Sequence, residues 1–328
     1  MADLKTTYMG IPLSSPLVVA ASLISSYIDR VKMAEQAGAG ALVIRSLFEE
    51  QILLDGLRLE ESLRVGEYSY AEATSYFPKI EHGQASEHLM WVEKTRKATG
   101  LPLFASLNAV SAEGWQGYAK QLAQTGVNGL ELNVYAVAAE ARKTGAQIEQ
   151  ELYAMVEAVR AEISIPIAVK LSPFYTSTVN VASELDKRGV NALVLFNRFL
   201  QPDIDPADES LHNEMTLSTP AEIKLPLRWI ALLYGRVKAD LAITTGVHAG
   251  KDAAKALLAG ATVVQTASAL IQQGIPYLST MLRELEGWME EHGYARLDDF
   301  RGKLSQKKAD NPFLFERAQY VNLLLSQV

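Results

Sequence analysis

Eight short apolar segments recur along this chain of 328 residues, and most of them precede a segment with the apolar spacing of a helix. Continuously apolar strands are typical of parallel sheets that are covered on both faces. Eight strand–helix units without a low-complexity linker favour a (β/α)8 barrel, a TIM barrel, over an open doubly wound sheet, which stays the alternative. The expected strands are Leu17–Ala21, Ala41–Arg45, Leu103–Leu107, Gly129–Asn133, Ile167–Leu171, Ala192–Phe196, Leu241–Thr244 and Thr262–Thr266.

Two long βα-loop insertions interrupt this rhythm, from Phe48 to His88 and from Asn197 to Pro226. Both follow the carboxyl end of an expected strand, which is the functional face of a barrel, so we expect them to form lids or substrate walls. We expect one barrel domain over residues 1–310. Residues 311–328 are expected to form a C-terminal helical extension, packed on the barrel or on a partner subunit.

Composition excludes several classes of protein. The net charge is −7 and no basic run occurs, so nucleic acid is not an expected partner. The chain has no cysteine, which rules out disulfides, iron–sulfur clusters and a cysteine nucleophile, and its five histidines lack the spacing of metal ligands. No signal peptide or membrane span of ~20 apolar residues is recognisable, so we expect a cytoplasmic protein without a membrane partner.

The last two expected strands end in turns of small residues, Gly246-Val247-His248-Ala249-Gly250 and Thr266-Ala267-Ser268-Ala269. Each turn opens into a helix, so backbone N–H groups should lie side by side at two helix N-termini. That arrangement favours a phosphate, and the loops after strands 7 and 8 of a barrel commonly bind one. The sequence therefore predicts a phosphorylated ligand at the Gly246–Val247 and Ala267–Ser268 turns.

Polar residues follow nearly every expected strand. Because unpaired polar groups are costly to bury, such a set indicates a binding site at the barrel mouth rather than a packed core. Four of these residues also have ordinary alternatives: Lys170 as a surface lysine, and Arg45 as the partner of Glu49 or Glu50 in a solvated patch. Asn133 and Asn197 could be ordinary caps at the ends of their strands. The set comprises Ser22, Arg45, Ser46, Ser106, Asn108, Asn133, Lys170 and Asn197.

Several of these residues stand in runs that are similar to family motifs. Val169-Lys170-Leu171-Ser172-Pro173 is similar to Val-Lys-Leu-Pro-Pro, and Leu132-Asn133 opens a run similar to Leu-Asn-Leu-Ser-Cys-Pro-Asn. On these motifs the chain resembles the dihydroorotate dehydrogenase family, flavin enzymes built on a (β/α)8 barrel. The likeness extends over about residues 8–304. Its other parts are 15–22, 44–46, 246–253, 260–270 and 293–304.

The resemblance implies that the cofactor is FMN, with its phosphate on the amides of Gly246, Val247, Ala267 and Ser268. A lysine beside the ring makes physical sense, because a fixed cation stabilises the anionic reduced flavin. The resemblance also implies that Lys170 and Arg45 take part in catalysis. The residues implied along the ring and ribityl chain are Ala20, Ala21, Ser22, Arg45, Ser46, Ser106, Asn108, Asn133, Lys170 and Asn197.

The substrate half departs from the family pattern. The family's catalytic base, a Cys or Ser, aligns with Ala136, and its substrate-binding Asn aligns with Ala138. Alanine cannot accept a proton, so another base is required, such as Tyr135 or Tyr175. The family loop Asn-Ser-Met-Gly-Leu-Pro-Asn aligns with residues 73–79, where both asparagines are absent.

The leading hypothesis is an FMN-dependent oxidoreductase that moves a hydride between a small substrate and flavin N5. Its substrate is not dihydroorotate, or is handled by changed residues, and the protein is expected to be a homodimer. Three alternatives stay open. They are dihydroorotate dehydrogenase proper in pyrimidine biosynthesis, a flavin-free lyase or aldolase with Lys170 as Schiff-base residue for a sugar phosphate, and a flavin-binding protein without catalysis. Gly246→Val is expected to give flavin-free protein of normal fold.

Overall fold

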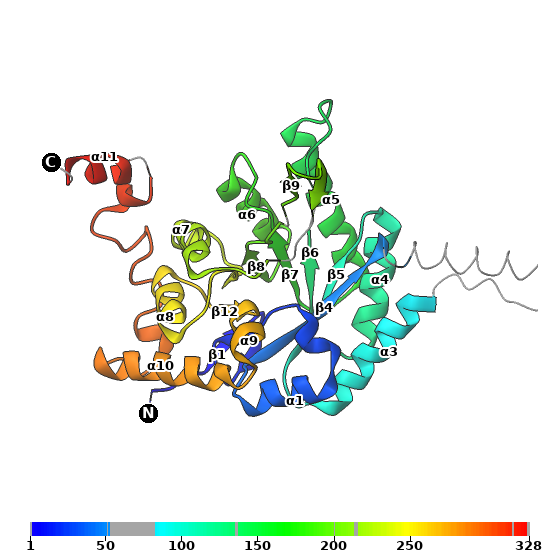
Figure 1. Ribbon diagram of the computed structural model, residues 1–328, viewed down its shortest axis with the longest axis horizontal. Helices are drawn as coiled ribbons and strands as arrows, with labels where there is room; N and C mark the ends of the chain where they lie inside the picture. Colours follow the sequence, from blue (N-terminus) through cyan, green and yellow to red (C-terminus); the bar gives the residue numbers. More distant parts are fainter. Residues whose placement is uncertain are drawn as a thin grey trace, which may run out of the picture.

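Eight parallel strands close into a barrel in the computed structural model, which describes residues 2–50, 52, 83–134, 137–199, 201–212, 216–316 and 318–326 (Figure 1). The hydrogen-bonded order is β11-β12-β3-β4-β5-β6-β7-β8, so the expected (β/α)8 barrel is confirmed. The barrel strands are β3 (Leu17–Val19), β4 (Ala41–Phe48), β5 (Leu103–Asn108), β6 (Gly129–Asn133), β7 (Ile167–Leu171), β8 (Ala192–Leu195), β11 (Asp240–Ile243) and β12 (Val263–Thr266).

Helices follow the strands and surround the barrel (Figure 1). Strand β4 runs three residues beyond the expected end, because an irregularity between Ile44 and Leu47 lets it pair with β5 again. The α-helices are α1 (Ile28–Gln36), α3 (Gly83–Ala98), α4 (Ala112–Gln124), α5 (Gly145–Glu162), α6 (Thr178–Lys187), α7 (Lys224–Leu233), α8 (Gly250–Ala259), α9 (Ser268–Gln273), α10 (Tyr277–Glu291) and α11 (Ala318–Leu325). The 3-10 helices are η1 (Leu23–Ser26), η3 (Pro220–Ile223), η4 (Leu297–Asp299) and η5 (Pro312–Phe315).

The core has two layers, because side chains alternate along each strand. One layer fills the space between strands and helices and includes Leu130 and Leu132 of β6. The other fills the barrel and includes Phe104, Ala168 and Val194. Glu131 lies between Leu130 and Leu132 on β6, so alternation points its carboxylate into the barrel. The same alternation turns Lys170 of β7 inward.

An N-terminal hairpin, β1 (Thr6–Tyr8) with β2 (Ile11–Leu13), packs against the residues inside the barrel. Tyr8 meets the Phe104 ring edge-on at 5.5 Å between centroids, and the Met9 amide donates to Asp240 Oδ2 at 2.7 Å. Asp240 begins its strand, so the hairpin covers the end of the barrel opposite to the strand carboxyl ends. This hairpin was not expected from the sequence.

The segments outside the strand–helix repeat differ in how much the structure shows. The second insertion forms a hairpin, β9 (Asp203–Asp205) with β10 (Ser210–His212), and then η3. Most of the first insertion, residues 53–82, lies outside the described residues. The C-terminal extension is two short helices, η5 and α11, and α11 stands apart from the barrel in Figure 1. No described helix is long and apolar enough to cross a membrane.

Candidate functional site

A chain of hydrogen bonds joins four of the expected site residues across the barrel mouth. Ser46 Oγ of β4 and Ser106 Oγ of β5 are 2.7 Å apart. The Asn133 amide at the end of β6 donates to Ser46 Oγ at 3.2 Å, and the Asn197 amide, just after β8, donates to Asn133 Oδ1. The structure therefore brings together side chains that are separated by up to 151 residues along the sequence.

Lys170 lies beside these residues on β7, whose register pairs it with Asn133 of β6. Its side chain is 12% exposed, and its Nζ is 3.9 Å from Glu131 Oε1. The other oxygen of Glu131 accepts a hydrogen bond from Gln265 Nε2 of β12 at 2.7 Å. Lys170 is thus an inward-facing cation at the mouth, and the alternative of a surface lysine does not hold.

Arg45 follows the regular part of β4, and Glu49 is not its partner. The Glu49 carboxylate instead accepts from the Val110 and Ser111 amides at 2.7 and 2.9 Å and so caps the start of α4. Burial raises the pKa of Glu49, but the hydrogen bonds from Ser111 and Val110 outweigh it, so the net pKa is lowered. Arg45 is left to line a cavity of about 360 Å³, together with Ser26, Ser46, Leu47, Phe48, Ile52, Glu87, His88 and Trp91.

His88 of α3 is the least expected residue of that cavity. It is buried, and its Nε2 has no hydrogen-bond partner within the described structure. Burial, and then the positive charge of Arg45, lower its pKa to about 4. The imidazole is therefore neutral at pH 7, and Arg45 supplies the positive charge on this side of the mouth.

The remaining expected residues are placed as follows. The Ala20 amide donates to Thr266 O at 2.9 Å beside Ala21, Ser22 Oγ caps η1 by accepting from the Ile24 amide at 3.4 Å, and Asn108 is buried at the end of β5. Burial is the largest of the effects that raise the pKa of Tyr175 to about 12, so its phenol keeps its proton at neutral pH and is a poor general base. Tyr135, Ala136 and residues 73–79 lie outside the described residues.

The two turns expected to bind phosphate lie side by side, because Thr266 Oγ1 donates to Val247 O at 3.0 Å. Gly246 has a φ of +78°, and a Cβ there would lie 2.2 Å from the backbone nitrogen of Ile223. Only glycine fits this turn without displacing the chain. The expectation that Gly246→Val keeps a normal fold is therefore wrong, since the valine would meet backbone atoms.

The N-terminus of α8 is less open than its sequence suggested. The amides of His248 and Ala249 donate to Asp252 Oδ2 at 3.1 and 3.2 Å, and the Gly250 amide donates to Glu284 Oε2 at 2.7 Å. These two carboxylates accept hydrogen bonds from the backbone amides that would otherwise be free to bind an anion. Within the described part of the chain, the amides of Val247, Ala267 and Ser268 have no hydrogen-bond acceptor.

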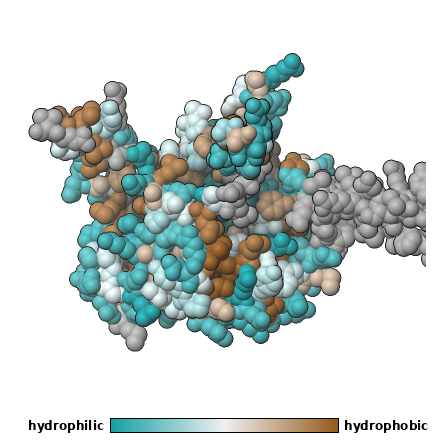
Figure 2. Space-filling view, in the orientation of Figure 1, coloured by the Kyte–Doolittle hydropathy of each residue, from teal (hydrophilic) through white to brown (hydrophobic). Residues whose placement is uncertain are grey.

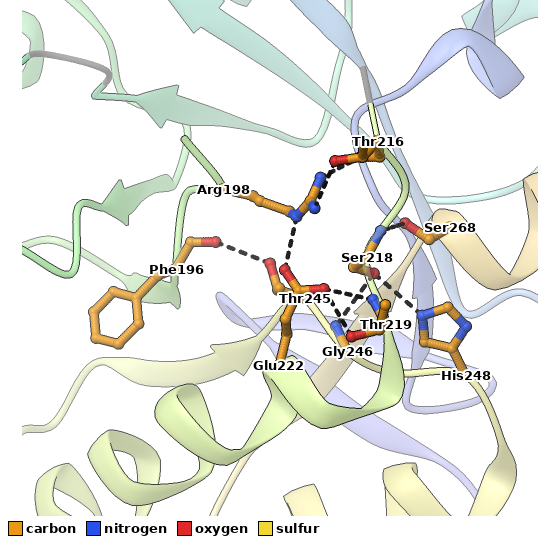
Figure 3. A network of polar contacts seen from close by, with 10 residues as sticks. All are labelled: Phe196, Arg198, Thr216, Ser218, Thr219, Glu222, Thr245, Gly246, His248 and Ser268. Carbon is orange, nitrogen blue, oxygen red and sulfur yellow. Dashed lines mark hydrogen bonds and ion pairs between the residues drawn. The ribbon is translucent and has the colours of Figure 1, made fainter. Parts of the chain in front are cut away.

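Ser218, which was not expected from the sequence, completes these turns (Figure 3). Ser218 Oγ is 3.2 Å from His248 Nε2 and 3.4 Å from the Gly246 amide, and the Ser218 amide donates to Ser268 Oγ at 3.0 Å. The signal for Ser218 was its place just before Thr219-Pro220, at the start of a helix. It lies inside an insertion, 28 residues before Gly246, so spacing did not point to it.

Arg198 fixes the Ser218 segment against the barrel, as Figure 3 shows. Its Nε donates to Glu222 Oε1 at 2.9 Å, and its guanidinium also donates to the carbonyl oxygen of Thr216. Burial raises the pKa of Glu222, yet its hydrogen bonds with Thr219 and Arg198 give a lowered pKa overall. The hydroxyls of Ser218 and Ser268, the His248 ring and the amide of Val247 thus gather around the two turns. Among the described residues, no group of three or more His, Asp or Glu side chains could hold a metal ion.

Comparisons with known proteins show which family this chain is similar to. A family model described as dihydroorotate dehydrogenase matches residues 78–289. The catalytic subunit of dihydroorotate dehydrogenase B (NAD(+)) from Methanothermobacter thermautotrophicus is 29% identical over 91% of this chain and 97% of its own length. Dihydroorotate dehydrogenase A (fumarate) from Lacticaseibacillus paracasei is 30% identical over 61% of this chain and 70% of its own.

A third relative carries a different activity in its name. The chloroplastic dihydropyrimidine dehydrogenase (NADP(+)) of Arabidopsis thaliana is 21% identical over 92% of this chain and 76% of its own length. These similarities give no support to the alternative of a flavin-free lyase or aldolase.

Proposed function

We propose a function from the premise that this chain belongs to the dihydroorotate dehydrogenase family and is an oxidoreductase acting on CH–CH donors: it binds FMN and exchanges a hydride with a small anionic substrate. One observation carries the proposal. Two turns with amides that have no acceptor among the described residues lie side by side, at the same end of a barrel as an inward-facing lysine and a row of hydrogen-bonding side chains.

The turns fit a phosphate. The unpaired amides of Val247, Ala267 and Ser268 and the hydroxyls of Ser218 and Ser268 supply neutral donors, and small side chains let the backbone approach an anion closely. His248 adds a ring nitrogen on the same side. These residues would hold the FMN phosphate.

The mouth residues would orient the rest of the cofactor. FMN supplies the hydride acceptor when it is bound. Ser46, Ser106, Asn133 and Asn197 present polar atoms that are already fixed by one another, so little ordering is needed on binding. Lys170 places a positive charge at the edge of this row, where it stabilises negative charge that develops nearby.

The phosphate assignment can be tested with the matched pair Ser268→Asp and Ser268→Asn. Both side chains can accept the Ser218 amide as Ser268 Oγ does, but only Asp adds a negative charge. We expect Ser268→Asp to weaken FMN binding by about 100-fold, the effect of a like charge ~5 Å away, and to leave riboflavin binding within about threefold. Equal FMN affinity in the two variants would place the phosphate elsewhere.

The cavity beside the mouth supports an anionic substrate other than dihydroorotate. Arg45 supplies a cation there, His88 is neutral, and the cavity volume is within the range of small-ligand sites. The sequence has alanine at 136 and 138, where the family has its base and a substrate-binding Asn. General-base help is typically worth ~10²–10⁴-fold, so dihydroorotate should reduce the flavin slowly.

An anaerobic reduction screen tests the substrate. Dihydroorotate, a neutral dihydropyrimidine and other saturated carboxylic acids are mixed with the yellow protein, and flavin bleaching is followed. We expect an acid other than dihydroorotate to bleach the flavin fastest, and Arg45→Met to slow that reaction. Rapid bleaching by dihydroorotate would instead establish dihydroorotate dehydrogenase proper.

The C-terminal extension supports a homodimer. Helix α11 exposes Tyr320, Val321, Leu323, Leu324 and Leu325, and apolar side chains gather over this helix in Figure 2. Exposed apolar side chains gathered in this way are typical of a surface that a partner covers, and eight residues are too few for a stable helix alone in water. A second copy of this chain would cover it.

Sedimentation of the holoprotein tests this arrangement. The double substitution Val321→Glu with Leu324→Glu should yield monomers, whereas Met90→Glu, an equally apolar-to-acidic change at an exposed site of α3, should not. A wild-type protein that sediments as a monomer, or a dimer that survives both α11 substitutions, would refute it.

A further inference from the structure

The Lys170 site includes a carboxylate that the proposed function does not use. Glu131 lies inside the barrel and is 1% exposed. It is the only carboxylate within 4.0 Å of Lys170 Nζ in the described part of the chain. Glu131 stands two residues before Asn133 on β6 and so lies below the mouth, where its burial keeps it from contacting a substrate.

The carboxylate is incompletely satisfied where it lies. Glu131 Oε2 accepts from Gln265. Among the described residues, Glu131 Oε1 has no hydrogen-bond partner, and neither do Gln265 Oε1 and the Tyr8 hydroxyl in the same barrel. Burying a charge in this way is costly unless it is paired. The ammonium of Lys170 is the partner that compensates Glu131, so the two charges depend on one another.

Other charges inside the barrel are already accounted for. Asp240 accepts from the Met9 amide and from Thr262 Oγ1. Burial, and then the charges of Glu131 and Asp240, raise the pKa of Tyr8 well above its ordinary value, so that phenol stays neutral. Among the described residues, Lys170 at the mouth and Glu131 below it therefore pair with one another and with no other charged side chain within 4.0 Å.

We propose that Glu131 is a positioning residue, which holds the Lys170 ammonium in place from inside the barrel and offsets part of its positive charge. This inference rests on the proposed function. Its consequence is that the site stabilises an anion above Lys170 less strongly than an unpaired lysine would. Glu131 thereby sets how readily the bound flavin is reduced.

The test compares Glu131→Gln with Glu131→Asp in flavin-containing protein. Gln keeps the shape and removes the charge, whereas Asp keeps the charge and shortens the side chain. At a fixed applied potential, Glu131→Gln should raise the ratio of reduced to oxidised flavin at least tenfold, and Glu131→Asp should change it less than threefold. A residue with only a packing role would give the opposite order, because the shortened side chain leaves the larger gap.

A second comparison shows whether Glu131 acts through the lysine. In a Lys170→Met background, Glu131→Gln should shift the flavin ratio less than threefold, because no ammonium remains to be released. A tenfold shift there would overturn the positioning role. Wild-type protein without bound flavin would remove the proposed function and this inference together. Flavin-containing Glu131→Gln with an unshifted ratio would remove this inference alone.

Discussion

Lys170→Met should destabilise the fold as well as alter the flavin site, because it leaves Glu131 buried without its counter-charge. The separation of 3.9 Å between Lys170 Nζ and Glu131 Oε1 corresponds to about 4 kcal/mol at an effective dielectric constant of about 20. Removing one partner of a buried pair costs roughly 3–5 kcal/mol. Lys170 keeps 12% exposure, so we take the lower end and expect a loss of about 3 kcal/mol in the free energy of unfolding.

The assay is urea unfolding followed by far-ultraviolet circular dichroism on four flavin-free proteins: wild type, Lys170→Met, Glu131→Gln and the double variant. Removing the flavin keeps differences in ligand binding out of the comparison. The double variant should recover about 2 kcal/mol or more relative to Lys170→Met, since no buried charge is left. If Lys170→Met unfolds at the wild-type urea concentration, or the double variant is as unstable as the single one, the pair does not compensate as argued.

Three further predictions follow from single residues. Between about pH 6.5 and about pH 4, His88 is protonated in the unfolded chain but neutral in the folded protein. The free energy of unfolding should therefore fall as pH is lowered, by at most about 1.4 kcal/mol per pH unit. His88→Leu should flatten this slope in pH-dependent unfolding. Gly246→Ala should lower the unfolding temperature more than Gly189→Ala, which shares a positive φ but would meet no atom within 4 Å; equal losses would show that the Ile223 backbone yields freely. Tyr175→Phe should keep flavin reduction by substrate within about twofold, and a loss of ~10² or more would identify Tyr175 as the base.

The sequence alone determined the barrel and much of its mouth. Strands Gly129–Asn133 and Ile167–Leu171 have the predicted bounds, because a short, mostly apolar run between helical segments is typical of a strand buried in a parallel sheet. Strand ends also come to one face of a parallel barrel by construction, so Ser46, Asn133 and Asn197 could be expected to meet. That these three side chains lie close together follows from the barrel topology alone, and the order of strand and helix segments in the sequence predicts that topology.

Other parts of the site depend on contacts across the barrel, which a sequence does not display. Ser218 reaches the Gly246 turn from inside an insertion, and Asp252 and Glu284 occupy amides that seemed open to an anion. The pairing of Glu131 with Lys170 and Gln265 depends on the register at which the strands close. Alternation along a strand gives the direction of a side chain, but only closure of the barrel decides which group faces it and therefore which charges are compensated.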